Sequence, residues 1–250
     1  MISLKNALQQ DGIRRSASLL NAVFARIGTL IEPGVSTAEI DRVVEETIKS
    51  GGGVPAFLGY GGFPASVCAS VNDQVIHGIP NERPLQDGDI VGCDIGVILD
   101  GYYSDACRSF AVGSVGESTR SLLDVTRESL EAAVAACVPG GRVKDIGRAV
   151  TETVEPHGFG VVYSYCGHGV GLALHEDPQV PNYYPSRGSN PRLKPGMVLA
   201  VEPMINAGAP DVDVLDDGWT VVTSDGSLSA HFEHTVLITE NGPEVLTAWD

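Results

Sequence analysis

Three stretches of the chain have the composition of buried β-strands, and each contains one carboxylate. The stretches are residues 90–99, 197–204 and 232–238, and their acids are Asp94, Glu202 and Glu233. None of the three contains Lys or Arg. Burying an unpaired carboxylate costs several kcal/mol, so each acid requires a cation, a set of hydrogen-bond donors or a raised pKa. A single such acid is commonly an exposed strand-edge or loop residue, but three of them favour a shared site.

The Asp-Gly pair at residues 100–101 is typical of a two-residue hairpin turn between the first of these stretches and residues 102–111. With this turn, Asp94 lies opposite Cys107 and diagonal to Asp105. The two carboxylates then share one face of the sheet about 7 Å apart, near enough to bind one cation or a pair. A bulge would break this register, and Asp105 alone fits a solvated hairpin residue equally well.

His168 lies between Gly167 and Gly169, where the backbone can pack closely and the imidazole is the only side chain over three positions. That pattern suits a ligand, although a lone histidine is more often an ordinary core or surface residue. The nearby glycines do not form a G-x-G-x-x-G phosphate loop, because Leu172 stands at the last position. A dinucleotide site is therefore excluded.

Four carboxylates and one imidazole form a set of hard oxygen ligands with one borderline nitrogen. Such a set suits divalent manganese, iron, cobalt or zinc, and four anionic ligands can neutralise two divalent ions. A water between two such ions becomes acidic enough for hydrolysis. The candidate ligands are Asp94, Asp105, His168, Glu202 and Glu233. His77 and His175 could donate to a substrate carbonyl or leaving nitrogen, and their spacing fits ordinary histidines as well.

Composition excludes several classes of function. Lys and Arg total 16 against 32 Asp and Glu, for a net charge of −16, and no basic stripe marks a surface for direct nucleic-acid binding. No uncharged run approaches the roughly 18 residues of a membrane span. The five cysteines include no C-x-x-C pair, which favours a reducing compartment. We therefore expect a cytoplasmic protein without a membrane segment.

Helical and strand-like patterns alternate in two rounds. Apolar spacing predicts helices over residues 19–30 and 37–48, with Ser36 as a cap, and again over 121–137 and 143–157. Strand-like runs follow each pair, the later ones over residues 160–174, 197–206 and 219–246. The order predicts an α+β chain of one catalytic domain, residues 1–250, whose two similar halves, about 1–115 and 116–250, carry helices over curved antiparallel sheets.

These residues stand within a series of motifs that resembles the type I methionine aminopeptidases, which have the pita-bread fold. The motifs are Ser66-Val67-Cys68, His77-Gly78-Ile79-Pro80, Asp94 with Asp105, Tyr165-Cys166-Gly167-His168-Gly169-Val170-Gly171, Glu202-Pro203-Met204 and Glu233-His234-Thr235. The resemblance covers nearly the whole chain, and the absence of a cysteine-rich N-terminal extension favours the short bacterial form.

The resemblance implies two divalent metals held by the five candidate ligands, with Asp105 and Glu233 bridging them and Asp94 near the substrate amine. It implies that Glu202 shuttles a proton, that His175 stabilises the carbonyl oxygen and that His77 lies near the scissile nitrogen. It also implies a methionine pocket, for which ordinary core packing is the competing interpretation. The pocket residues are Phe57, Tyr60, Phe63, Cys68, Leu174 and Trp219.

Phe57, Gly61 and Leu174 depart from residues common in bacterial members, so the sequence leaves open which first residues the pocket accepts. The expected substrates are N-termini of nascent polypeptides with a small second residue, with transient ribosome contact and a monomeric enzyme. One competing reading is a proline-directed peptidase of the aminopeptidase P and prolidase group. The other is a binding protein of this fold, which the five filled ligand positions disfavour.

Overall fold

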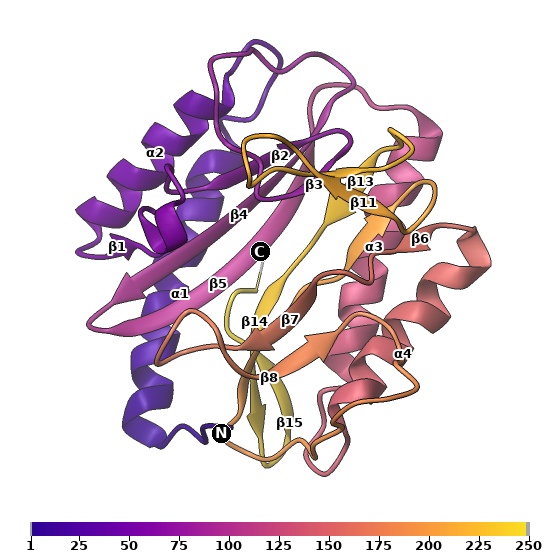
Figure 1. Ribbon diagram of the computed structural model, residues 1–250. Coiled ribbons are helices and arrows are strands. Elements are labelled where there is room, and N and C mark those ends of the chain that lie inside the picture. The colour runs from indigo at the N-terminus through magenta and orange to yellow at the C-terminus, as the bar shows by residue number, and fades with distance from the viewer. Residues whose placement is uncertain (1, 249–250) are drawn as a thin grey trace.

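A long antiparallel hairpin runs through the centre of the computed structural model, which describes residues 2–248 (Figure 1). Strands β4 (Ile90–Leu99) and β5 (Tyr102–Ala111) form it, and Leu99 pairs with Tyr102. Asp100 and Gly101 occupy the turn with φ of 52° and 81°. Positive φ at both positions is the geometry of a type I′ turn, so the Asp-Gly pair sets this register as predicted.

Two helices cover one face of the sheet that contains the hairpin. Strands β1 (Val54–Pro55) and β2 (Cys68–Val71) pair with different parts of β4, and β5 pairs with β4 along its whole length. Helices α1 (Ala7–Gly28) and α2 (Thr37–Ser50) pack on these strands and on each other. Ser36 caps α2 as predicted, because its side chain accepts the backbone N–H of Glu39 at 3.2 Å. The core cluster beneath these helices draws its buried residues from positions 20–112.

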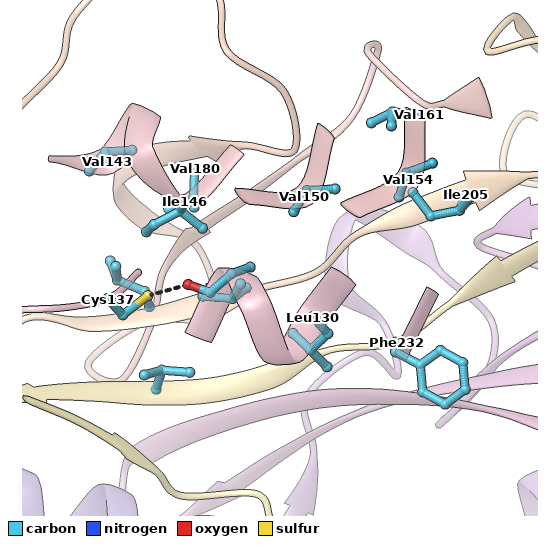
Figure 2. Close-up of a cluster of buried hydrophobic side chains, with 14 of the residues drawn as sticks. Leu130, Cys137, Val143, Ile146, Val150, Val154, Val161, Val180, Ile205 and Phe232 are labelled. Carbon is cyan, nitrogen blue, oxygen red and sulfur yellow. Dashed lines mark hydrogen bonds between the residues drawn. The ribbon is translucent and has the colours of Figure 1, made fainter. Parts of the chain in front are cut away.

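The second large sheet has five antiparallel strands in the order β15-β14-β9-β7-β8. Their bounds are β7 (Cys166–Gly169), β8 (Glu176–Pro181), β9 (Val198–Val201), β14 (His234–Thr239) and β15 (Gly242–Val245). Helices α3 (Glu117–Ala135) and α4 (Val143–Val154) pack against each other and against this part of the molecule. Val143, Ile146, Val150 and Val154 line one face of α4 toward Leu130, in a core cluster that spans positions 90–238 (Figure 2).

Two three-stranded sheets complete the fold. One has the order β13-β10-β6, from β13 (Ser229–His231), β10 (Met204–Asn206) and β6 (Gly160–Val161). The other has the order β11-β12-β3, from β11 (Val212–Val214), β12 (Val221–Thr223) and β3 (Gln74–Ile76). The short 3-10 turns are η1 (Tyr60–Gly62) and η2 (Glu155–His157). Because β3 pairs with β12, the early and late parts of the chain share one sheet.

The predicted α+β class and all four predicted helices are confirmed, although α1 begins earlier than the apolar pattern indicated. The strand predicted over residues 160–174 is wrong in part, because residues 170–175 form a loop in which Gly171 has φ of 129°. Strand β8 was not predicted, since its two prolines suit only an edge strand and its apolar content is low. The division into two similar halves near residue 115 stays a prediction.

Candidate metal centre

The central hairpin brings two of the predicted ligands to one face of the sheet. Asp94 pairs with Cys107 and Asp105 pairs with Gly96, which is the diagonal placement that the sequence predicted. Thr235 of β14 ties this strand to the second sheet, because its hydroxyl accepts the N–H of Asp105 at 3.0 Å and donates to the carbonyl of Asp105 at 2.7 Å. The hairpin and the second sheet are therefore locked together at Asp105.

The second sheet supplies the other three predicted ligands. His168 lies in β7, while Glu202 directly follows β9 and Glu233 directly precedes β14. The N–H of Glu233 donates to the carbonyl of Cys107 at 2.8 Å, and the side-chain amide of Asn182 donates to the carbonyl of Glu202 at 2.9 Å. These backbone bonds fix both glutamates at strand ends, where their side chains are free to converge.

Three of these carboxylates each have a buried oxygen that lacks a hydrogen-bond donor among the described residues. Asp105 is 3% exposed and Glu233 is 2% exposed. One oxygen each of Asp94, Asp105 and Glu233 is buried with no hydrogen-bond partner among residues 2–248. Unpartnered buried oxygens are costly, so a cation or protons must compensate them.

The pKa values of these acids show the same cost. Burial raises the pKa of Asp105 to about 7. Burial raises the pKa of Asp94 and of Glu233 well above the usual range, and the charge of Asp105 adds to both shifts. Burial and then the charge of Asp94 do the same for the pKa of Glu202. The site thus has a strong electrostatic preference for bound positive charge.

The imidazole of His168 is oriented as a ligand. Its Nδ1 lies 2.9 Å from the carbonyl of Gly169, which can only accept, so Nδ1 carries the proton. Its Nε2 then presents a lone pair 3.5 Å from an oxygen of Glu202 and 3.9 Å from one of Asp105. Burial, followed by the nearby His175, lowers the pKa of His168 to about 4 and keeps the ring neutral. A backbone carbonyl that fixes the tautomer in this way is typical of metal-bound histidines.

Ligand atoms of Asp105, His168 and Glu233 lie within 4.8 Å of one another. Three donors at that spacing can converge on one divalent ion, and Asp94 and Glu202 line the same cavity. The donor set, the neutral imidazole and the unpartnered oxygens all fit a divalent metal. The structure thus brings the five predicted ligands to one cavity, and their role in binding metal stays a prediction.

A cavity of about 530 Å³ opens beside this centre, and every predicted site residue lines it. Phe57, Phe63, Cys68 and Leu174 are buried and belong to one apolar cluster, to which Trp219 is packed. Tyr60 is 48% exposed and contributes its hydroxyl instead. The apolar wall is thus continuous with the acidic floor, which suits a ligand with an apolar side chain and a cationic end.

The two predicted catalytic histidines lie on the wall of the cavity. The ring of His77 packs edge-on against Tyr165 and Trp219, with centroids 6.0 and 6.3 Å away, and burial lowers its pKa to about 4. The Nδ1 of His175 lies 2.8 Å from the hydroxyl of Tyr60, and its ring centroid lies 4.3 Å from that of His168. Burial also lowers the pKa of His175. Both rings are therefore neutral near pH 7 and can donate a hydrogen bond.

Sequence reasoning gave no role to several residues that the structure places at the site. Tyr165, Cys166 and Gln179 line the cavity, and Thr235 holds Asp105. Tyr165 and Cys166 belong to the motif around His168, and Thr235 belongs to the motif that begins with Glu233. Gln179 was missed because it lies in β8, which was not predicted; it pairs with His168 across the sheet.

Comparison with known proteins decides the family. Residues 11–240 match the model of metallopeptidase family M24. The chain is 50% identical over 247 residues to the methionine aminopeptidase of Treponema pallidum, covering 99% of this chain and 96% of that protein. It is 47% identical over 247 residues to methionine aminopeptidase 1 of Bacillus subtilis, covering 99% of each. The chain belongs to the methionine aminopeptidases of metallopeptidase family M24.

Solved structures give the same result for the fold. The methionine aminopeptidase of Rickettsia prowazekii superposes with a TM-score of 0.96 at 40% identity, covering 99% of this chain and 100% of that one. A prolidase from Pyrococcus furiosus superposes with a TM-score of 0.80 at 26% identity, covering 99% of this chain and 66% of that one. The predicted pita-bread fold is thereby confirmed. Membership of a metallopeptidase family implies the use of a divalent metal.

The sequence also predicted that the chain has no membrane-spanning segment. Within residues 2–248, every helix is too short or too polar to cross a membrane.

Proposed function

We propose that this chain removes the N-terminal methionine from proteins and peptides and that it binds two divalent metal ions to do so. The observation that carries the proposal is the convergence of buried, unpartnered carboxylates and one oriented imidazole beside an apolar cavity. The relatives that cover the whole chain and are named methionine aminopeptidases support the substrate. The residues that would hold the ions are Asp94, Asp105, His168, Glu202 and Glu233.

The chemistry divides between the metals and the side chains of this chain. When bound, the two ions supply Lewis-acid activation of a water for attack on the first peptide carbonyl. His175 donates a hydrogen bond to the carbonyl oxygen as negative charge develops there. Glu202 accepts a proton from the nucleophile and returns it to the leaving nitrogen, near which His77 lies. Asp94 orients the free amine by its negative charge.

We propose that the apolar wall is the pocket for the methionine side chain. Phe57, Phe63, Cys68 and Leu174 provide a buried apolar and sulfur-containing surface, and Trp219 and Tyr60 close it. A flexible thioether fits such a wall well because it makes favourable contacts with aromatic rings. The acidic floor then holds the amino group, so side chain and amine are recognised at opposite ends of the cavity. A small second residue is expected from the family.

The proline-directed alternative has less support. The prolidase of Pyrococcus furiosus is 26% identical to this chain, which covers 66% of it, whereas the methionine aminopeptidase of Treponema pallidum is 50% identical and is covered to 96%. The binding-protein alternative leaves the five converging ligands without a purpose. We further propose a single-domain monomer that acts in the cytoplasm on nascent chains, with transient contact to the ribosome.

The test is removal of bound metal by a chelator, followed by re-addition of single metals and assay on two peptides. We expect release of methionine from Met-Ala-Ser after addition of manganese, iron, cobalt or zinc, and little cleavage of a peptide with proline second. If only the proline peptide is cleaved, the chain is a proline-directed peptidase and the methionine proposal is rejected. Full activity without any metal would reject the metal mechanism.

A further inference from the structure

Lys5 is a buried cation far from the metal ligands in sequence. Its side chain is 1% exposed, and its Nζ donates to Oε2 of Glu176 at 2.7 Å, in a pair whose acid is 13% exposed. A buried ion pair contributes little net stability compared with apolar residues of the same size, so its value is often positional. This pair joins the segment before α1 to the start of β8.

The other oxygen of Glu176 holds the loop that carries two cavity residues. Oε1 of Glu176 accepts the backbone N–H groups of Leu172 at 2.7 Å and Ala173 at 3.2 Å. Leu174 and His175 stand between those amides and Glu176 in the chain, and both line the cavity. The Glu176 carboxylate therefore joins the end of this loop to the amides at its start, and Lys5 is the counter-ion of that carboxylate.

Lys5 is itself held firmly beneath this loop. Its N–H donates to the carbonyl of Gly196 at 2.7 Å, and its carbonyl accepts from the side-chain amide of Gln10 at 2.7 Å. A Cβ at Gly171 would come within 3.2 Å of the Lys5 side chain and 2.5 Å of Ile13, so the N-terminal segment packs directly against the start of the loop. Figure 1 shows the N-terminal end of the chain close to β8.

We propose that Lys5 is a positioning residue that acts through Glu176 to hold the 172–175 loop, so that His175 faces the substrate carbonyl. This inference rests on the proposed role of His175. Without the ammonium, the Glu176 carboxylate is a buried anion without a counter-ion and turns toward water, which releases the two loop amides. His175 then keeps the contact between its Nδ1 and the exposed Tyr60 hydroxyl, at 2.8 Å, and the packing of its ring against that of His168, with centroids 4.3 Å apart. Loss of orientation lowers kcat, because a donor must be in place as charge develops.

The first test compares Lys5→Met with Arg14→Met, assayed on Met-Ala-Ser with manganese. Arg14 is the matched control, because it also joins the N-terminal part of the chain to a strand by an ion pair. Its Nε lies 2.8 Å from Oε1 of Glu244 in β15, and neither residue lines the cavity. We expect Lys5→Met to lower kcat by roughly 10- to 100-fold at unchanged metal content, and Arg14→Met to leave kcat within about twofold of the wild type. A Lys5→Met enzyme with wild-type kcat would overturn the proposal.

The second test separates positioning from general stability. Lys5→Met is repeated in a His175→Ala background, where the donor that Lys5 is proposed to position is absent. We expect Lys5→Met to lower kcat by less than about threefold in that background, because Lys5 and His175 act as one unit. An equal fold-change in kcat in the wild-type and His175→Ala backgrounds would show that Lys5 does not act through His175. Failure of the wild type to release methionine would instead reject the proposed function.

A third comparison removes the buried charge and guards against misfolding of the single variant. Lys5→Met/Glu176→Gln keeps a carbonyl oxygen for the two loop amides, whereas Lys5→Met/Glu176→Ala keeps none. We expect the Gln double variant to have a kcat at least about tenfold above that of the Ala double variant. Equal kcat values in these two uncharged variants would contradict the proposal even if Lys5→Met alone does not fold.

Discussion

The Nε2 of His168 lies 3.5 Å from Oε1 of Glu202, and the two atoms face each other with lone pairs when the acid is ionised. The proton on Nδ1 of His168 is engaged by the carbonyl of Gly169, so it cannot relieve that repulsion. Only a proton on the acid or a cation between the two groups can do so. Metal and protons therefore compete for the same space.

Metal loading should release protons. Burial raises the pKa of Glu202, Glu233 and Asp94 well above the usual range and that of Asp105 to about 7, so the metal-free site holds protons near neutral pH. A metal binds the ionised forms, so its binding expels those protons. The number released should fall as the pH rises through and beyond 7, because fewer acids then hold protons. Calorimetric titration with manganese in buffers of different ionisation enthalpy measures this number.

Glu202→Gln is the control for proton release, because the amide carries no titratable proton. It should release fewer protons than the wild type on manganese binding. Binding without any proton release in the wild-type protein would show that the acids are ionised before the metal arrives.

His168→Ala should weaken metal binding by at least about 10-fold and remove most activity, since it deletes the single nitrogen ligand. His157→Ala is the control, because His157 is an exposed residue of η2 that does not line the cavity. Metal content after dialysis and turnover of Met-Ala-Ser check both variants. A His168→Ala protein with wild-type metal content would remove His168 from the proposed ligands.

His77→Ala should reduce turnover by roughly 10²-fold while metal content stays unchanged, because the ring lies on the cavity wall and acts on the substrate. Single-turnover kinetics and metal analysis on the same sample measure the two properties. A large fall in metal content would instead make His77 part of the metal site.

Phe57→Ala should lower kcat/KM for a methionine peptide by roughly 10- to 100-fold, since it removes a buried wall of the proposed pocket. The larger space should improve the relative rate for a bulkier first residue such as phenylalanine. Phe110→Ala is the aromatic control, because Phe110 is partly buried against the core cluster beneath α1 and α2 and does not line the cavity, and it should keep the wild-type preference. Unchanged preference in Phe57→Ala would assign Phe57 to core packing alone.

The parts of the site that local patterns could predict depend on short-range geometry. The Asp-Gly turn fixes the pairing of two ten-residue strands, so the relation of Asp94 to Asp105 follows from the sequence. Glu202 and Glu233 were recognisable because an acid in an apolar run needs a physical reason. Both inferences use neighbours in the chain or in one hairpin.

Long-range contacts were beyond such patterns. Nothing around Lys5 indicates that it pairs with Glu176, which lies 171 residues away. The loop before Glu176 reads as strand because Val170, Leu172 and Leu174 alternate, yet the conformation of Gly171 and the two bonds to the Glu176 carboxylate turn the chain. The bond between Tyr60 and His175 also joins segments 115 residues apart. Tertiary structure alone reveals these relations.

The most direct test of the central claim is the number of metal ions bound at the onset of catalysis. Manganese is added stepwise to chelated protein while bound metal and methionine released from Met-Ala-Ser are measured on the same samples. The account predicts that the wild type binds up to two equivalents of manganese and that methionine release rises with this binding. A Glu233→Gln variant is predicted to lose both the metal binding and the activity. Methionine release by fully chelated protein, or full metal binding by Glu233→Gln, would contradict it.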